Sequence, residues 1–212
     1  MAAVTKINYA SIVRKASASK SIGRRVHDSL LSKFEIIKDK MLDDFDNHII
    51  TRELEEEREG GSNISATLPE GYGNLFSFIG FNVEDHPTVP VRQKLEDIRF
   101  PIGAYATPFV KGGKIQFTYR IKLPTLTLND FPSTEYPDGW RDGSWLYGIE
   151  NGIPNFESYL FDENFDSYTQ SRSTTGLQAK TRSKQVIIIR EGAFSPVQYI
   201  SKILEKFVSR LR

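Results

Sequence analysis

The chain has 212 residues, 39% of them hydrophobic and 26% charged, which is enough apolar material for one large domain with a buried core. It contains no cysteine, so disulfides, zinc–thiolate sites, iron–sulfur clusters and thiol nucleophiles are excluded. The formal net charge is +1, but residues 1–40 carry nine basic and three acidic side chains, and residues 41–70 carry two and nine. Such segregation steers copies or partners together, unless the charges belong to ordinary solvated faces.

The first 45 residues divide into an arm and a helix. Residues 1–19 are rich in Ser, Ala and Lys and hold few apolar anchors, which predicts an arm. Basic residues interrupt its apolar runs, so we expect no secretory signal, and no later stretch is apolar for long enough to span a membrane. Residues 20–45 carry an apolar stripe with helical spacing: Ile22, Val26, Leu30, Phe34, Ile37, Met41 and Phe45.

The middle of the chain favours β-structure. Residues 48–54 fit a short strand or sheet edge, and residues 74–81, an apolar run between glycines, fit a buried strand. A short helix is expected to begin near Pro90. Apolar and polar side chains alternate over residues 115–122, which predicts a strand that Gly112-Gly113 joins to an earlier strand at residues 102–110.

The last third of the chain combines a short helix, a long polar stretch, a strand and a terminal helix. The short helix is expected within residues 140–150, a long loop at residues 151–183 and a strand at residues 185–189. Ser195-Pro196 fits a helix start, followed by an amphipathic C-terminal helix.

This order of elements predicts an α+β fold, in which the long N-terminal helix packs on a mostly antiparallel β-sheet. Residues 20–212 would form a single domain behind the arm.

The search for chemical motifs predicts no enzyme. The three histidines have no ligand-like spacing, and Asp43, Asp44 and Asp46 cannot all share one face of a helix. The chain has no phosphate-binding loop, dinucleotide fingerprint or nucleophile elbow. We therefore expect no catalytic residue, no metal site and no cofactor.

Five stretches and the chain's last helix carry a resemblance to a known family. The most specific is Gly71-Tyr-Gly-Asn-Leu-Phe-Ser-Phe-Ile-Gly-Phe81, and the others are residues 45–53, 145–152, 171–173 and 176–180. Together with the basic amphipathic helix that ends the chain, they resemble virion structural proteins of tailed bacteriophages. The similarity is to the neck or tail-completion type, which joins the head connector to the tail.

The resemblance implies a structural subunit of the virion, assembled in the host cytoplasm into a ring of six or twelve copies. Its neighbours would be other neck, connector and tail proteins, with no membrane contact. DNA would pass through the channel without sequence-specific binding. Ring contacts of this kind are heterologous, so two different faces must be complementary.

The segregated charges and the long loop supply the candidate subunit contacts, which are Arg24, Arg25, Asp43, Asp44, Glu53, Glu55, Tyr168, Arg172 and Lys180. A tail terminator or another tail-associated ring is the alternative within the virion. A DNA-binding or DNA-processing protein is the alternative of another class, because Tyr168, Arg172 and Lys180 mix aromatic and basic groups.

Overall fold

The computed structural model describes residues 15, 20–56, 62–68, 74–101, 109–111, 114–116, 120–125, 127, 129–137, 143–153 and 194–212. Its elements in chain order are α2 (Lys20–Asp46), α3 (Ile49–Glu56), α4 (Leu75–Ile79), α5 (Thr88–Glu96), β1 (Phe109–Lys111), β2 (Lys114–Gln116), η1 (Pro132–Thr134), α6 (Trp145–Asn151) and α7 (Ile200–Leu211). The predictions of an N-terminal arm, a loop and a final strand concern residues 1–19, 151–183 and 185–189, which lie almost wholly outside these ranges.

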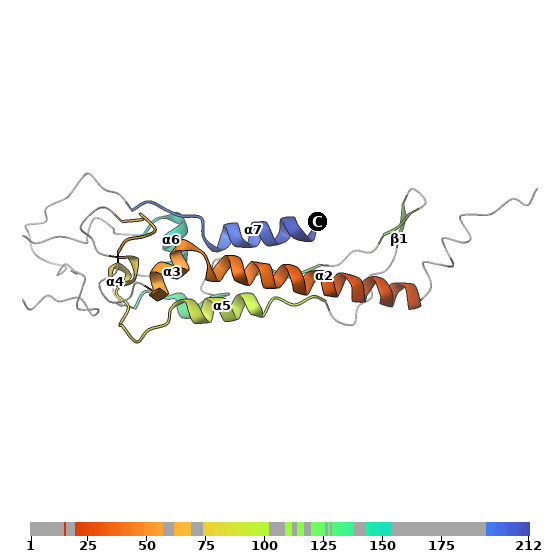
Figure 1. The fold of residues 1–212 in the computed structure, drawn as a ribbon, viewed down its shortest axis with the longest axis horizontal. Coiled ribbons are helices and arrows are strands. Elements are labelled where there is room, and N and C mark those ends of the chain that lie inside the picture. The colour runs from red at the N-terminus through yellow and green to blue at the C-terminus, as the bar shows by residue number, and fades with distance from the viewer. Residues whose placement is uncertain are drawn as a thin grey trace, which may run out of the picture.

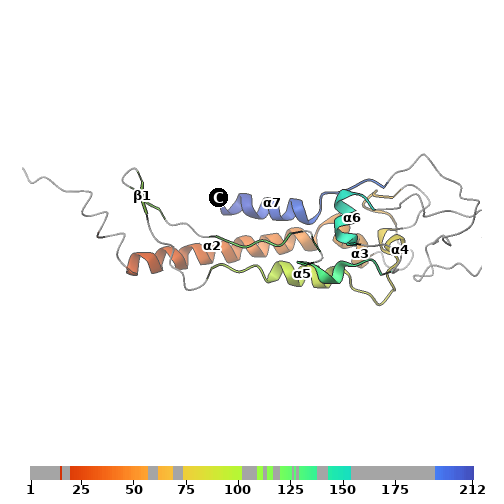
Figure 2. The same ribbon diagram turned by 180° about the vertical axis from the view of Figure 1, so that it is seen from behind.

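The longest helix of the described residues is α2, which confirms the helix predicted at residues 20–45. Its 27 residues correspond to about 40 Å of helix. α7 and α5 lie on either side of its C-terminal half in Figures 1 and 2. Phe34 of α2 packs against Phe207 of α7 and against Phe100, with ring centroids 5.7 and 5.5 Å apart. The N-terminal part of α2 continues beyond the end of α7 in both views.

The predicted α+β fold is wrong, because helices and not a sheet cover α2. The β-structure of the described ranges is one antiparallel hairpin, in which Val110 pairs with Ile115 and Lys111 with Lys114, and one isolated bridge. Figures 1 and 2 show β1 apart from the helical body. The two strands are three residues long each and pair as the predicted hairpin requires, whereas residues 102–108, 112–113 and 117–119 of that prediction lie outside the described residues.

The end of the predicted strand, residues 120–122, lies in an extended segment at residues 120–125. Ile121 and Leu123 are half-buried and pack against the helical core, whereas Arg120 and Lys122 are exposed. An extended chain has a period of two whether or not it pairs in a sheet. In this segment, the alternation of apolar and polar residues therefore reflects a chain with one side packed on helices and the other side in solvent.

Residues 49–56 form α3 and not the predicted strand. Its buried residues, Ile50, Thr51, Glu53 and Leu54, gather on one side of a helix. The two isoleucines and the threonine at its start favour a strand locally, but tertiary packing decides for the helix.

Residues 75–79 form the short helix α4 and not the predicted buried strand. The Asn74 side chain accepts a hydrogen bond from the Ser77 N–H at 2.9 Å and so caps its first turn. Gly80, with φ +95°, ends the helix in the left-handed conformation. All five helical residues are buried, and such an apolar run has no period that distinguishes a helix from a strand.

The helices α5, α6 and α7 confirm three predicted helices, but α7 begins later than expected. The N–H groups of Ser195 and Val197 donate to the carbonyls of Thr67 and Ile149, both at 2.9 Å, which keeps this segment out of the helix. The first turn of α7 is capped instead by Glu150 of α6, whose Oε1 accepts from the N–H groups of Tyr199 and Ser201 at 3.2 and 2.8 Å.

Candidate functional site

Four acidic residues of α2 and α3 bind other parts of the same chain. Asp46 receives two hydrogen bonds from Arg92 of α5, at 2.8 and 3.0 Å, and Asp44 pairs with Arg210 of α7 at 2.7 Å. The hydrogen bonds that Arg92 donates to Asp46 raise the pKa of its guanidinium. These pairs fix the C-terminal half of α2 to the helices on both sides of it.

Glu53 and Glu55 of α3 also bind other parts of the same chain. Glu53 is fully buried, and its two oxygens accept from the N–H groups of Ser65 and Leu75 at 2.7 and 2.6 Å. Glu55 accepts from the N–H and the hydroxyl of Thr88 and so caps α5. A buried carboxylate with both oxygens occupied has nothing left to offer a neighbouring subunit, so we exclude Glu53 from the proposed contact surface.

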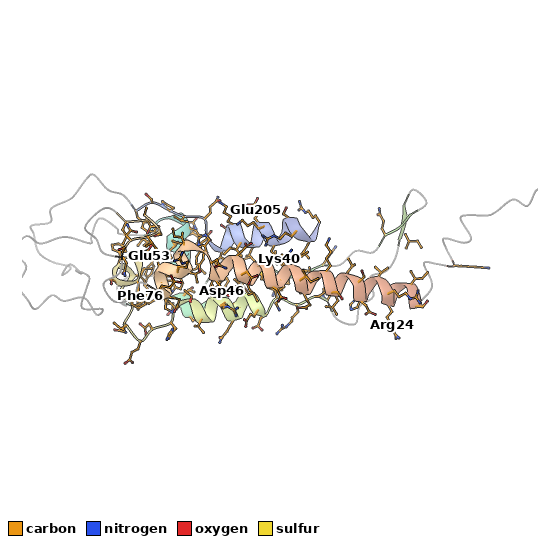
Figure 3. All side chains as sticks on the ribbon, in the orientation of Figure 1. Arg24, Lys40, Asp46, Glu53, Phe76 and Glu205 are labelled. Carbon is orange, nitrogen blue, oxygen red and sulfur yellow. The ribbon has the colours of Figure 1, made fainter. Side chains whose placement is uncertain are left out.

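The other predicted contact residues divide into exposed ones and ones outside the described ranges. Arg24, Arg25 and Asp43 are exposed on α2, and Arg24 lies near the free end of the helix in Figure 3. Tyr168, Arg172 and Lys180 lie outside the described residues. The exposed predicted contacts therefore lie on one helix, with the two arginines near its start and Asp43 near its end.

A ridge on α2 remains exposed between the helices that cover it. Ile22, Ser29 and Ile36 recur every seven residues, and all three are exposed, Ile36 by 59%. Residues seven apart lie on nearly the same face of a helix. The two isoleucines expose apolar surface at points about 21 Å apart along the helix.

Charged residues of opposite sign border this ridge. Lys33 and Lys40 lie on one side and form the basic row, and Asp28, Glu35 and Asp39 lie on the other and form the acidic row. All five are exposed, and none forms an ion pair with another residue in the part of the chain that the structure describes. We call the ridge and its two rows together the open face.

The open face was missed in the sequence because its positions fall between those of the apolar stripe. A period of seven at Ile22, Ser29 and Ile36, flanked by charges of one sign on each side, is the signal that could have found it. The apolar stripe that includes Phe34, Ile37 and Met41 dominates the sequence pattern, and these residues form the buried side of α2.

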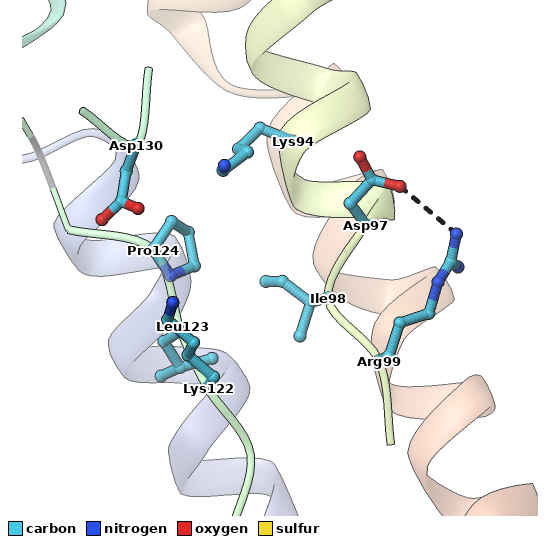
Figure 4. A pocket seen from close by; sticks show the side chains of 8 residues that line it. All are labelled: Lys94, Asp97, Ile98, Arg99, Lys122, Leu123, Pro124 and Asp130. Atoms are coloured by element: carbon cyan, nitrogen blue, oxygen red, sulfur yellow. Dashed lines mark hydrogen bonds and ion pairs between the residues drawn. The ribbon is translucent and has the colours of Figure 1, made fainter. Parts of the chain in front are cut away.

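A groove of about 250 Å³ lies between the end of α5 and the extended segment at residues 120–125 (Figure 4). Lys94 and Asp130 point into it from opposite sides, and Ile98 and Leu123 supply apolar lining. The hydrogen bond from the Thr125 hydroxyl lowers the pKa of Asp130, and the hydrogen bond from the Thr125 N–H lowers it further. The groove therefore presents a fixed carboxylate beside lysine side chains, an arrangement that suits a polar side chain of a partner.

His48 is a titratable group with a shifted pKa that lies close to α7. Burial lowers its pKa below 6.5, and the charges of Lys206 and Lys202 lower it further. Its ring lies 4.7 Å from that of Tyr199, and its Nδ1 accepts from the Ile50 N–H at 3.3 Å. These contacts make His48 part of the junction between α2, α3 and α7.

Among the residues that the structure describes, no three His, Asp or Glu side chains are placed to hold a metal ion. The helices within the described ranges also include none with the length and apolar character needed to cross a membrane.

Comparison with family models, with curated proteins and with solved structures finds no match to this chain.

Proposed function

We propose that this chain is a structural subunit that works by assembling with copies of itself, as a ring of the neck or tail-completion type in a tailed-bacteriophage virion. The observation that carries the proposal is the open face of α2. It combines two exposed isoleucines with rows of opposite charge on one long helix. A surface of this composition is suited to a protein partner and to repeated contact.

The way α2 is anchored supports the same proposal. Arg92 and Arg210 tie α2 to α5 and α7, and Lys38, which is buried, donates to the backbone carbonyl of Glu96 at the end of α5. Because α5 and α7 hold the C-terminal half of α2 on two sides, the exposed third side of that half has little freedom to rearrange. Preorganisation of this kind lowers the entropic cost of association.

Sedimentation velocity of the full chain over a range of concentrations tests the assembly step. We expect species at multiples of 24.1 kDa whose formation weakens as salt is added, because exposed charges are screened. Peptide mass spectrometry of purified particles of the encoding phage tests the virion role. A chain that never self-associates and is missing from such particles contradicts the proposal.

The position of the chain in a cryo-EM map of those particles separates the alternatives within the virion. Density between the connector and the tail supports a neck or tail-completion ring, whereas density at the tail end or along the tube supports a terminator or another tail-associated ring.

DNA binding is the competing function, favoured by the exposed basic row. Tight binding of the monomer to duplex DNA that falls steeply between 50 and 200 mM salt would support that class instead. We expect weak binding, because the acidic row lies beside the basic row on the same helix.

A further inference from the structure

We infer that neighbouring copies touch through the open face of α2, with the helices parallel and the basic row of one copy against the acidic row of the next. The inference rests on the proposed function and names the contact that would build the assembly. Because the basic row of one copy is complementary in charge to the acidic row of another, the partner that binds the open face is a second copy of this chain.

The two rows have the angular separation that a ring requires. At about 100° per residue, Lys33 and Lys40 lie roughly 130° around the helix axis from the mean of Asp28, Glu35 and Asp39. Different faces that meet give a heterologous contact, which closes when successive copies turn through a constant angle. Faces less than half a turn apart produce such a turn, whereas faces on opposite sides would give a straight array.

The charges disfavour the two symmetric ways of pairing two copies of α2. Antiparallel two-fold pairing along the ridge places each row against itself, so that lysines face lysines. Parallel two-fold pairing matches the rows, but Arg25 and Asp43 lie midway between the rows and would then face their own counterparts. Contact between the basic row of one copy and the acidic row of the next avoids both repulsions.

The parallel arrangement also matches the rows in height. Copies related by one rotation axis keep the same polarity, so equal residue numbers lie at equal heights. Lys33 then lies within two residues, or about 3 Å of rise, of Glu35 in the next copy, and Lys40 lies within one residue of Asp39. Lysine and carboxylate side chains span such offsets readily.

Charge reversal with complementation tests this contact in the full chain. The basic-row variant carries Lys33→Glu and Lys40→Glu, and the acidic-row variant carries Glu35→Lys and Asp39→Lys. All four side chains are exposed, so both variants should keep the helical circular dichroism and the unfolding midpoint of the unaltered chain.

The matched control reverses two exposed lysines elsewhere. Lys202→Glu with Lys206→Glu on α7 makes the same change in net charge as the basic-row variant. Its self-association, followed by sedimentation velocity at low ionic strength, should equal that of the unaltered chain.

Each row variant alone should need at least about tenfold more protein to assemble, because residues 33 and 40 then carry the same sign as residues 35 and 39. An equimolar mixture should restore assembly, since acidic rows then meet basic rows in alternating copies. Row variants that assemble as well as the unaltered chain, or a mixture that fails to recover, would overturn the inference and leave the proposed function standing. An unaltered chain that stays monomeric at every concentration would overturn the inference, and its absence from purified particles as well would overturn the proposed function.

Discussion

Gly148 of α6 lies against the side chain of Tyr136. A methyl group at position 148 would overlap the Tyr136 hydroxyl oxygen and lie 3.4 Å from Cγ1 of Ile153. Tyr136 and Ile153 are both buried, so neither side chain can move into solvent without exposing apolar surface. The glycine is therefore required by close approach and not by its backbone conformation.

Gly148→Ala should lower the free energy of unfolding by about 1–3 kcal/mol, the usual cost of overpacking a core. Urea denaturation gives this value. In a Tyr136→Phe background the same alanine should cost less, because the overlapping oxygen is gone. Tyr147→Ala, at a position 52% exposed on the same helix, should change stability by no more than ~0.5 kcal/mol. Equal losses at 147 and 148 would contradict the steric account.

His48 should make stability depend on pH. Its pKa is lower in the folded chain than the ordinary 6.5, because burial and Lys206 oppose the charged form. The unfolded chain therefore binds the proton more readily, and stability present above pH 6.5 is lost as pH falls toward the folded pKa. Urea midpoints between pH 7.5 and 5 should fall less in His48→Gln than in the unaltered chain. Midpoints that fall equally in the variant and the unaltered chain would contradict this account.

Buried and half-buried carboxylates join the elements of this fold. Glu53 connects α3 to residues 65 and 75, Glu55 connects α3 to α5, and Glu150 connects α6 to the start of α7. Each accepts from backbone N–H groups, and the N-terminus of a helix favours negative charge. The acidic character of this part of the chain thus belongs largely to its internal architecture.

Glu53→Gln should destabilise the fold by about 1–3 kcal/mol, because a side-chain amide has one acceptor oxygen and would place its NH2 group against a buried N–H. Either Ser65 or Leu75 would lose its partner. Glu56→Gln is the matched control, since Glu56 is exposed and, among the described residues, its ion pair is with Arg52, a contact worth no more than ~1 kcal/mol. Urea denaturation of both variants decides. Equal stability of the two would contradict the clamp assigned to Glu53.

The whole molecule is an elongated helical body from which α2 extends. Around its C-terminal half, α2 buries Phe34, Met41 and Phe45 completely, whereas Ile22 near its N-terminus is 36% exposed. Fewer buried apolar contacts lower the local free energy of opening. The projecting part of α2 is therefore the portion whose order depends most on a neighbour.

Hydrogen exchange should reveal this gradient. In the isolated chain, amides of residues 24–31 should exchange faster than those of residues 37–45, and assembly should slow the first group more than the second. Exchange followed by mass spectrometry at low and high protein concentration measures both rates. Uniform protection along α2 in the monomer would contradict the gradient.

Prediction from sequence succeeded where the signal was a local period. Phe34, Ile37 and Met41 recur on one helical stripe, and α7 shows the same kind of spacing. It failed at residues 49–56 and 74–81, where short apolar runs fit either a helix or a strand. Asn74 and Gly80 carried a usable signal for α4, as a cap and a left-handed end.

The sequence by itself determined that the chain contains a long amphipathic helix, three shorter helices and no cysteine, because periodicity and composition need no knowledge of distant residues. Only the tertiary structure decided what covers that helix, since an apolar stripe can pack on a sheet or on helices equally well. It also decided which charges remain available. Asp46 and Glu53 are engaged by residues 10 or more positions away, whereas Lys33 and Glu35 stay exposed on the one side of α2 that α5 and α7 leave open.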